Sequence, residues 1–166
     1  LRCARPDAPV LERARIAEYR VDGNAWRAVP AEPVVGTQVS LTHTATGGVI
    51  LSNGLVETVI EPDGTVSSLK DVQAGRELVP DGMRLGSYEL LKDEPSVWDA
   101  WESERDAFLR YETLVSGCII SAETGDDEAY VVVPTKHGQS RIDTTITSPS
   151  EAKQLDFAAH VDWHER

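Results

Sequence analysis

Cysteine is scarce in this sequence, and the two cysteines are not arranged to bind a metal or to pair. Among 166 residues only Cys3 and Cys118 are thiols, with no CxxC spacing and no histidine nearby. This pattern predicts neither a zinc knuckle nor a disulfide framework. We expect Cys118 to be buried in a strand and Cys3 to lie in a loose terminus. The cysteines do not decide the cellular compartment. The cytoplasm is favoured over secretion because residues 1–17 contain no signal-type apolar block.

The sequence also lacks long apolar runs and an excess of positive charge. No apolar run reaches the roughly 18 to 20 residues needed to cross a bilayer, so we expect a soluble chain without a membrane partner. Lys and Arg number 16 against 28 Asp and Glu, a net charge of -12. A chain this acidic repels a polyanion, so nucleic acid is not an expected partner.

A sustained helical period is absent as well, and alternation with a period of two takes its place in most segments. Near the N-terminus, Ile16 to Val21 and Ala25 to Val29 flank Asp22-Gly23-Asn24, which predicts a tight hairpin. Prolines and a glycine then indicate a linker. We therefore assign residues 1–47 to an N-terminal hairpin and linker, and residues 48–166 to the main domain.

The main domain has the pattern of regular strands joined by short turns. Val49 to Lys70 predicts a hairpin around Pro62-Asp63-Gly64. Four further strands are expected at Thr113 to Ala122, Ala129 to Thr135, Ser140 to Thr147 and Gln154 to Trp163. This spacing predicts an all-β fold, an antiparallel β sandwich. In the last run the alternating apolar side chains are expected to face the core: Leu155, Phe157, Ala159, Val161 and Trp163.

Both ends of the chain are unusual for a complete protein. The sequence starts at Leu1 and stops at Arg166, immediately after an apolar alternation. We expect something to lie outside both ends and the β domain to be incomplete at its C-terminus.

The segment from Asp93 to Arg110 has no clean period and predicts a long exposed loop. It contains Trp98, Asp99 and Trp101. Indole faces stack on sugar rings and a carboxylate accepts hydrogen bonds from hydroxyls, so these three are candidate substrate-binding residues. The alternative, and the more ordinary reading, is that both rings cap the sandwich.

His160, Asp162 and His164 are candidate metal ligands. On one strand they would share a face, with neighbours about 6.6 to 6.8 Å apart. A complete zinc site needs about four ligands, and no second ligand cluster is visible. We therefore expect a simple polar face and no metal in this chain.

The run from Leu51 to Leu69 (LSNGLVETVIEPDGTVSSL), followed by Asp71 and by Ala74 to Leu78 (AGREL), resembles the opening of the β domain in family 38 glycoside hydrolases, the α-mannosidases. The acidic segment Asp93 to Trp101 and the strand Leu155 to Arg166 are similar to later parts of that domain. The resemblance implies a supersandwich fold of the galactose mutarotase-like kind. It also implies that the zinc ion and the aspartate nucleophile belong to an N-terminal catalytic domain outside this sequence.

These observations lead us to expect a non-catalytic β domain of an α-mannosidase, with no catalytic residue and no cofactor of its own. The parent chain would hydrolyse terminal α-mannosides. The expected partners are the rest of that polypeptide, which this domain would brace, and mannosides, whose cleft it could line. Two alternatives stay open. One is a free-standing carbohydrate-binding module, and the other is a mutarotase-type enzyme, which would need a His and a Glu converging in one cleft.

Overall fold

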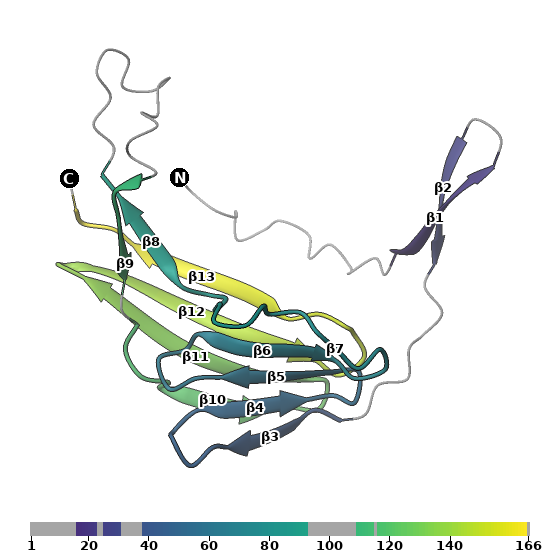
Figure 1. Ribbon diagram of the computed structural model, residues 1–166, viewed down its shortest axis with the longest axis horizontal. Coiled ribbons are helices and arrows are strands. Elements are labelled where there is room, and N and C mark those ends of the chain that lie inside the picture. Colours follow the sequence, from purple (N-terminus) through teal and green to yellow (C-terminus); the bar gives the residue numbers. More distant parts are fainter. Residues whose placement is uncertain (1–15, 23–24, 31–37, 93–108, 115, 166) are drawn as a thin grey trace. The chain divides into compact units, whose positions relative to one another are not determined.

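The computed structural model describes residues 16–22, 25–30, 38–92, 109–114 and 116–165 (Figure 1). The chain divides into two units, Leu1–Val35 and Gly36–Arg166. In the first unit, β1 (Ile16–Asp22) pairs antiparallel with β2 (Ala25–Pro30), as the alternation predicted. Within the described residues, no helix is long and apolar enough to span a membrane.

The second unit consists of two antiparallel sheets and a short ribbon. The first sheet has the strand order β3-β4-β5-β6-β7, and the second has the order β10-β11-β12-β13. The first contains β3 (Ser40–His43), β4 (Val49–Ser52), β5 (Val56–Ile60), β6 (Val66–Asp71) and β7 (Arg76–Glu77). The second contains β10 (Ser121–Thr124), β11 (Glu128–His137), β12 (Ser140–Pro149) and β13 (Asp156–Asp162). The ribbon pairs β8 (Tyr88–Leu91) with β9 (Tyr111–Leu114).

Alternate residues of both sheets meet in one apolar core. The fully buried side chains include Leu51 and Ile60 from the first sheet and Val131 and Ile146 from the second. Burial of each such side chain contributes about 1.5–3 kcal/mol. Two antiparallel sheets packed through their inner faces form an antiparallel β sandwich, so the predicted all-β fold class is confirmed.

The predicted domain boundary falls at a different place from the division of the structure. The second unit begins at Gly36, and β3 pairs along its whole length with β4. Residues 40–43 were assigned to the linker from the sequence. In the structure they form an edge of the first sheet, because Leu41 can pack against the core beside Leu51.

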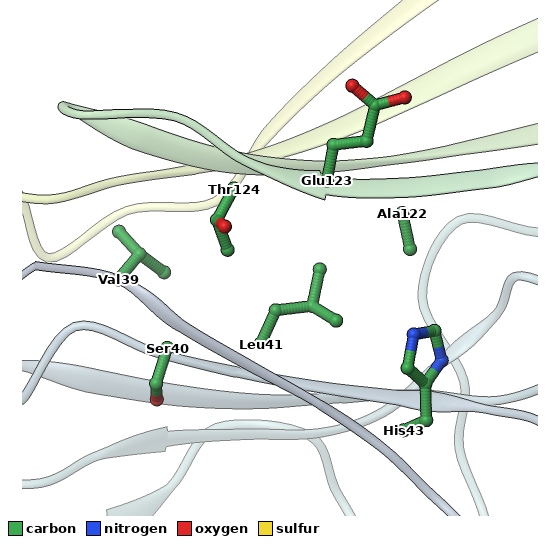
Figure 2. Close-up of a pocket in the computed structure, with 7 residues that line it drawn as sticks. All are labelled: Val39, Ser40, Leu41, His43, Ala122, Glu123 and Thr124. Atoms are coloured by element: carbon green, nitrogen blue, oxygen red, sulfur yellow. The ribbon is translucent and has the colours of Figure 1, made fainter.

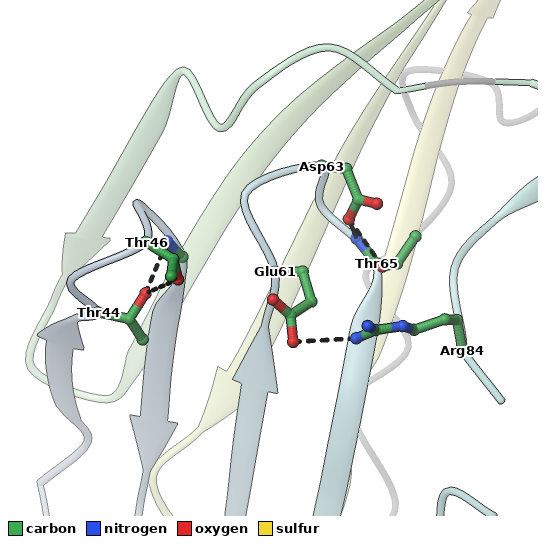
Figure 3. Close-up of polar contacts among 7 residues, drawn as sticks. Thr44, Thr46, Glu61, Asp63, Thr65 and Arg84 are labelled. Atoms are coloured by element: carbon green, nitrogen blue, oxygen red, sulfur yellow. Dashed lines mark hydrogen bonds and ion pairs between the residues drawn. The ribbon is translucent and has the colours of Figure 1, made fainter. Parts of the chain in front are cut away.

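The turn between β5 and β6 has the local geometry that its sequence predicts. Asp63 Oδ1 accepts hydrogen bonds from the backbone N–H of Thr65 at 2.9 Å and from its hydroxyl at 2.7 Å (Figure 3). Gly64 has φ of +81° and donates its N–H to the carbonyl of Glu61 at 2.8 Å. A Cβ at Gly64 would collide with the side chain of Val133 in the other sheet. Glycine is therefore needed here both for the backbone conformation and for close packing.

Asn53 joins the two sheets through a buried side-chain amide. Its Nδ2 donates to the carbonyl of Pro149, the last residue of β12, at 2.6 Å and to that of Ala152, just beyond β12, at 2.9 Å. Its Oδ1 accepts from the backbone N–H groups of Leu55 at 2.9 Å and Val56 at 2.8 Å. The amide thus uses both of its donors and both acceptor positions.

The predicted strand from Thr113 to Ala122 is wrong, because the structure divides it between β9 and β10. The ladder between β10 and β11 ends at Val132. Two residues further on, Pro134 has no N–H for a neighbouring strand, and its carbonyl accepts from Gly117 N at 2.7 Å in an irregular connection. Cys118 lies in that connection and is exposed, so the expected burial of its thiol is also wrong.

The burial expected for β13 is wrong, although the direction of its side chains is as predicted. Phe157 lies opposite Ile146, and Val161 lies opposite Ile142, so both point to the core side of the sheet. Nevertheless Phe157, Val161 and Trp163 are 43%, 52% and 44% exposed.

The side chains of β13 are exposed because the opposing sheet does not extend fully over them. β3 contacts β10 across the sandwich, so the first sheet ends toward β13 in β7, which has two residues. A strand this short leaves most of β13 uncovered. Beyond β7 the chain approaches β13 at Gly86, where an added Cβ would collide with the ring of Phe157.

We predict that Asn53→Ala destabilises the domain by at least about 3 kcal/mol, because it leaves buried backbone N–H and carbonyl groups without partners. Asn53→Asp retains the two acceptor interactions but loses both donors, and should also be strongly destabilising. Urea denaturation followed by circular dichroism measures both effects. Gln73→Ala, which removes an exposed side-chain amide, is the control and should change the free energy of unfolding by less than about 0.5 kcal/mol. An equal effect of the Asn53 and Gln73 variants would contradict the role of Asn53.

Candidate functional site

Trp98, Asp99 and Trp101, the candidate substrate-binding residues, lie outside the described residues. Their assignment stays a prediction. The carbohydrate-binding module alternative depended on the same three side chains, so it stays open as well.

A groove of about 640 Å³ opens between the edges of the two sheets, where β3 faces β10 (Figure 2). The groove lies on the side of the sandwich where β3 and β10 are the edge strands of the two sheets. Its core side is closed by Val39, which is buried, and by Leu41 and Ala122, which are partly buried. Seven residues line it: Val39, Ser40, Leu41, His43, Ala122, Glu123 and Thr124.

The groove contains one His and one Glu, the residue pair that a mutarotase-type enzyme would need. In Figure 2 the imidazole of His43 borders the groove, but the carboxylate of Glu123 is directed away from it. That carboxylate accepts hydrogen bonds from the hydroxyls of Tyr130 at 2.7 Å and Ser121 at 2.8 Å, and these lower the pKa of Glu123. The two groups do not converge, so the groove offers no acid/base pair.

The three metal-ligand candidates do not lie together on one strand. β13 ends at Asp162, and His164 follows in an irregular segment. There, His164 Nε2 lies 3.0 Å from Asp162 Oδ1, with both side chains at least half exposed. His160 lies on β13 opposite Asp143. Among the residues that the structure describes, no three His, Cys, Asp or Glu side chains are arranged to hold a metal ion.

The segment after β13 is attached to the turn between β11 and β12. The rings of His137 and Trp163 stack with centroids 6.2 Å apart and planes 6° apart. Glu165 accepts hydrogen bonds from the backbone N–H of Gln139 at 2.8 Å and from the hydroxyl of Ser140 at 3.1 Å. The Gln139 N–H is the main cause of a lowered pKa of Glu165. These contacts hold the end of β13 in place.

Glu77 belongs to the AGREL segment that carried the family resemblance, and its role in the structure is to fix the backbone. Its carboxylate accepts from the Ser68 hydroxyl at 2.6 Å and from the backbone N–H groups of Val79 and Leu69, each at 2.9 Å. A fourth bond comes from Leu78 N–H at 3.0 Å. These donors favour the ionised form and lower the pKa of Glu77 from 4.5 to about 2.

Sequence reasoning did not assign these polar roles to Asn53, Glu77 or Glu165. One local signal was available for Asn53, because Asn-Gly after a strand is typical of a turn. No local signal could have revealed that the amide also reaches the end of the second sheet, 96 residues away.

The fold and this geometry define the chain as an antiparallel β sandwich whose described polar groups mainly hold turns. Comparison with known proteins identifies the family of the chain. Residues 51–166 match the glycosyl hydrolases family 38 C-terminal domain, and the chain belongs to that family.

Its relatives include much longer enzymes. The chain is 34% identical over 142 residues to alpha-mannosidase 2C1 of Homo sapiens, covering 82% of this chain and 13% of the relative. The Mus musculus protein of the same name matches with the same values. Alpha-mannosidase G of Dictyostelium discoideum is 25% identical over 129 residues, covering 74% of this chain and 12% of the relative. The chain thus spans about an eighth of the length of these relatives.

The lowered pKa of Glu77 predicts a loss of stability in acid. Because its pKa is lower in the folded state than the ordinary 4.5, its contribution is fully present above pH 4.5 and is lost as the pH falls toward about 2. Glu77→Gln should therefore be destabilising at neutral pH, and its difference from the wild type should shrink across that window. Ser68→Ala removes the hydrogen bond that lowers the pKa most, so it should move the loss to higher pH. Urea denaturation at a series of pH values measures this, and a difference that is constant from pH 6 to 2.5 would refute it.

We also predict that zinc does not raise the melting temperature of this chain. A ligand that binds only the folded state stabilises it by mass action, so a site would appear as a saturable increase. Differential scanning fluorimetry with increasing zinc tests this. A saturable increase that is lost in the double variant His160→Ala with His164→Ala would restore the metal-site hypothesis.

Proposed function

We propose that this chain is a non-catalytic part of a longer α-mannosidase, in which it braces the catalytic domain and forms part of the wall of the substrate cleft. The observation that carries the proposal is the family match over residues 51–166, together with relatives named as alpha-mannosidases, of whose length this chain covers 12% and 13%. In the proposed enzyme, the zinc ion and the nucleophile belong to the catalytic domain.

The chemistry of the described carboxylates supports a scaffold role. A general acid needs an environment that raises its pKa, as in a retaining glycosidase, where the acid/base residue and the nucleophile lie about 5–5.5 Å apart. In this domain every described carboxylate with a clear shift has a lowered pKa: Glu61, Asp71, Glu77, Glu123 and Glu165. Such groups remain ionised and accept hydrogen bonds. They suit a scaffold better than proton transfer.

A domain that braces another also has to be rigid. The hydrogen bonds of Asn53 between the sheets and those of Glu165 with the turn between β11 and β12 tie separate parts of the sandwich together. For the cleft wall, Trp98, Asp99 and Trp101 stay the proposed contacts to mannose, on the grounds of their residue types alone.

The test is a chimera of human alpha-mannosidase 2C1 in which the 142 matched residues are replaced by those of this chain. We expect the chimera to hydrolyse an aryl α-mannoside, and an enzyme lacking those residues to be inactive. The isolated chain should not exceed the rate without enzyme, with or without zinc. In the chimera, Trp98→Ala should raise KM more than it lowers kcat if the ring lines the cleft.

Two results would overturn the proposal. One is hydrolysis by the isolated chain that is abolished by a point substitution within it. The other is a folded but inactive chimera. Near-ultraviolet circular dichroism separates that second result from a chimera that fails to fold.

A further inference from the structure

β13 is an edge strand with few of the features that usually protect an edge, because its two carboxylates, Asp156 and Asp162, stand only at its ends. It is last in the strand order of its sheet, and within the described ranges no strand lies along its outer side. It makes seven consecutive pairs with β12 without a bulge, and its sequence, DFAAHVD, contains no Lys, Pro or Gly. Natural edge strands are usually short, bulged or marked by such residues, because an open edge is a template for another strand.

The other described edges of the two sheets differ from β13. β3 and β10 have four residues each, and β7 has two. Short edges expose few backbone groups. β13 exposes the edge of a seven-residue strand in regular register. Among these four described edges, β13 is therefore the longest and the most regular.

The core side of β13 supplies a second, independent observation. Ile142 and Ile146 of β12 are buried, but their opposite residues Val161 and Phe157 are 52% and 43% exposed. Trp163 continues the same alternation and is 44% exposed, although one face of its indole stacks on His137. The apolar layer of the core therefore extends beyond the sheet that covers it. Aligned, half-exposed side chains of this size usually mark an interface.

We infer that β13 is an internal strand in the complete enzyme. A strand from the longer polypeptide pairs along its open edge, and apolar side chains of that polypeptide cover Phe157, Val161 and Trp163. This inference rests on the proposed function, because it takes the occupant from the seven-eighths of the relatives' length that this chain does not span. A second copy of this chain fits less well, since two chains of net charge -12 repel each other.

The experiment places the same substitution in two contexts, this 166-residue chain and the longer polypeptide. Val161→Lys replaces a half-exposed valine in the short chain and should lower its melting temperature by less than about 2 °C. In the longer polypeptide the same lysine would be buried without a partner and should lower it by more than about 5 °C. Val161→Thr is a milder variant for the case that Val161→Lys prevents the longer polypeptide from folding. It should also lower the melting temperature more in the longer polypeptide than in the short chain.

Two control substitutions calibrate the changes in melting temperature. His160→Lys lies on the opposite face of the same strand and should have a small effect in both contexts. Ile146→Lys lies in the common core and should have a large effect in both. Hydrogen exchange gives a measurement without substitutions: the amides of residues 156–162 should exchange at least about 100-fold more slowly in the longer polypeptide.

Equal small shifts for Val161→Lys in both contexts, with unchanged exchange of β13, would overturn the inference. It would also be overturned if sedimentation showed dimers of this chain that Val161→Lys dissociates, while the longer polypeptide showed no selective effect, since the occupant would then be a second copy. Hydrolysis of an aryl α-mannoside by the unsubstituted longer polypeptide is measured separately. If the longer polypeptide does not hydrolyse the mannoside, the proposed function is contradicted. If it does, and Val161→Lys changes the melting temperature equally in both contexts, only this inference is contradicted.

Discussion

The arrangement of the two sheets depends on the buried amide of Asn53, which makes four hydrogen bonds within the described part of the chain. Packing of apolar side chains brings sheets together but is not directional, so it does not fix how one sheet is placed along the other. The Asn53 amide does fix this placement, because its two acceptor bonds hold the turn before β5, and its two donor bonds hold the last residue of β12 and the chain that follows it. Inside the protein, these groups would each cost free energy if left unpaired. The turn before β5 in the first sheet and the end of β12 in the second are therefore held at a fixed position relative to each other.

The same logic explains why the acidic residues of this domain do not look catalytic. Glu77, Glu165 and Asp71 each accept hydrogen bonds from backbone N–H groups in turns or at strand ends. A carboxylate used in this way is stabilised as an anion, whereas proton transfer needs a group whose two protonation states are close in free energy. These three carboxylates thus serve local backbone structure, and a large number of acidic residues is by itself no sign of acid/base chemistry.

Local patterns allowed much of the fold to be predicted, and contacts distant in sequence account for the rest. The hairpin of β5 and β6 was predictable because alternation and a Pro-Asp-Gly turn lie within one short window. The first arm predicted from Val49 was too long, because the structure divides it at Asn53 into β4 and β5. The break between β9 and β10 was not predictable, because its cause, Pro134, lies on another strand. For β13 the alternation gave the correct face but could not reveal that the opposing sheet ends in a strand of two residues. The groove between β3 and β10 was likewise unpredictable, since it exists only where two sheet edges meet.

The exposed side of β13 links the stability of this domain to its setting. Full burial of a large apolar side chain contributes about 1.5–3 kcal/mol, and three such side chains on or just after β13 realise only about half of it. The stacking of Trp163 on His137 and the hydrogen bonds of Glu165 hold this strand in place with contacts from its own sheet. The strand is therefore ordered before it is covered. A covering strand would gain the remaining apolar burial without having to order β13 first, and pre-ordering of one partner lowers the entropic cost of association. Any segment that binds there stabilises the folded domain by mass action, so folding of the sandwich and its assembly with that segment are thermodynamically coupled.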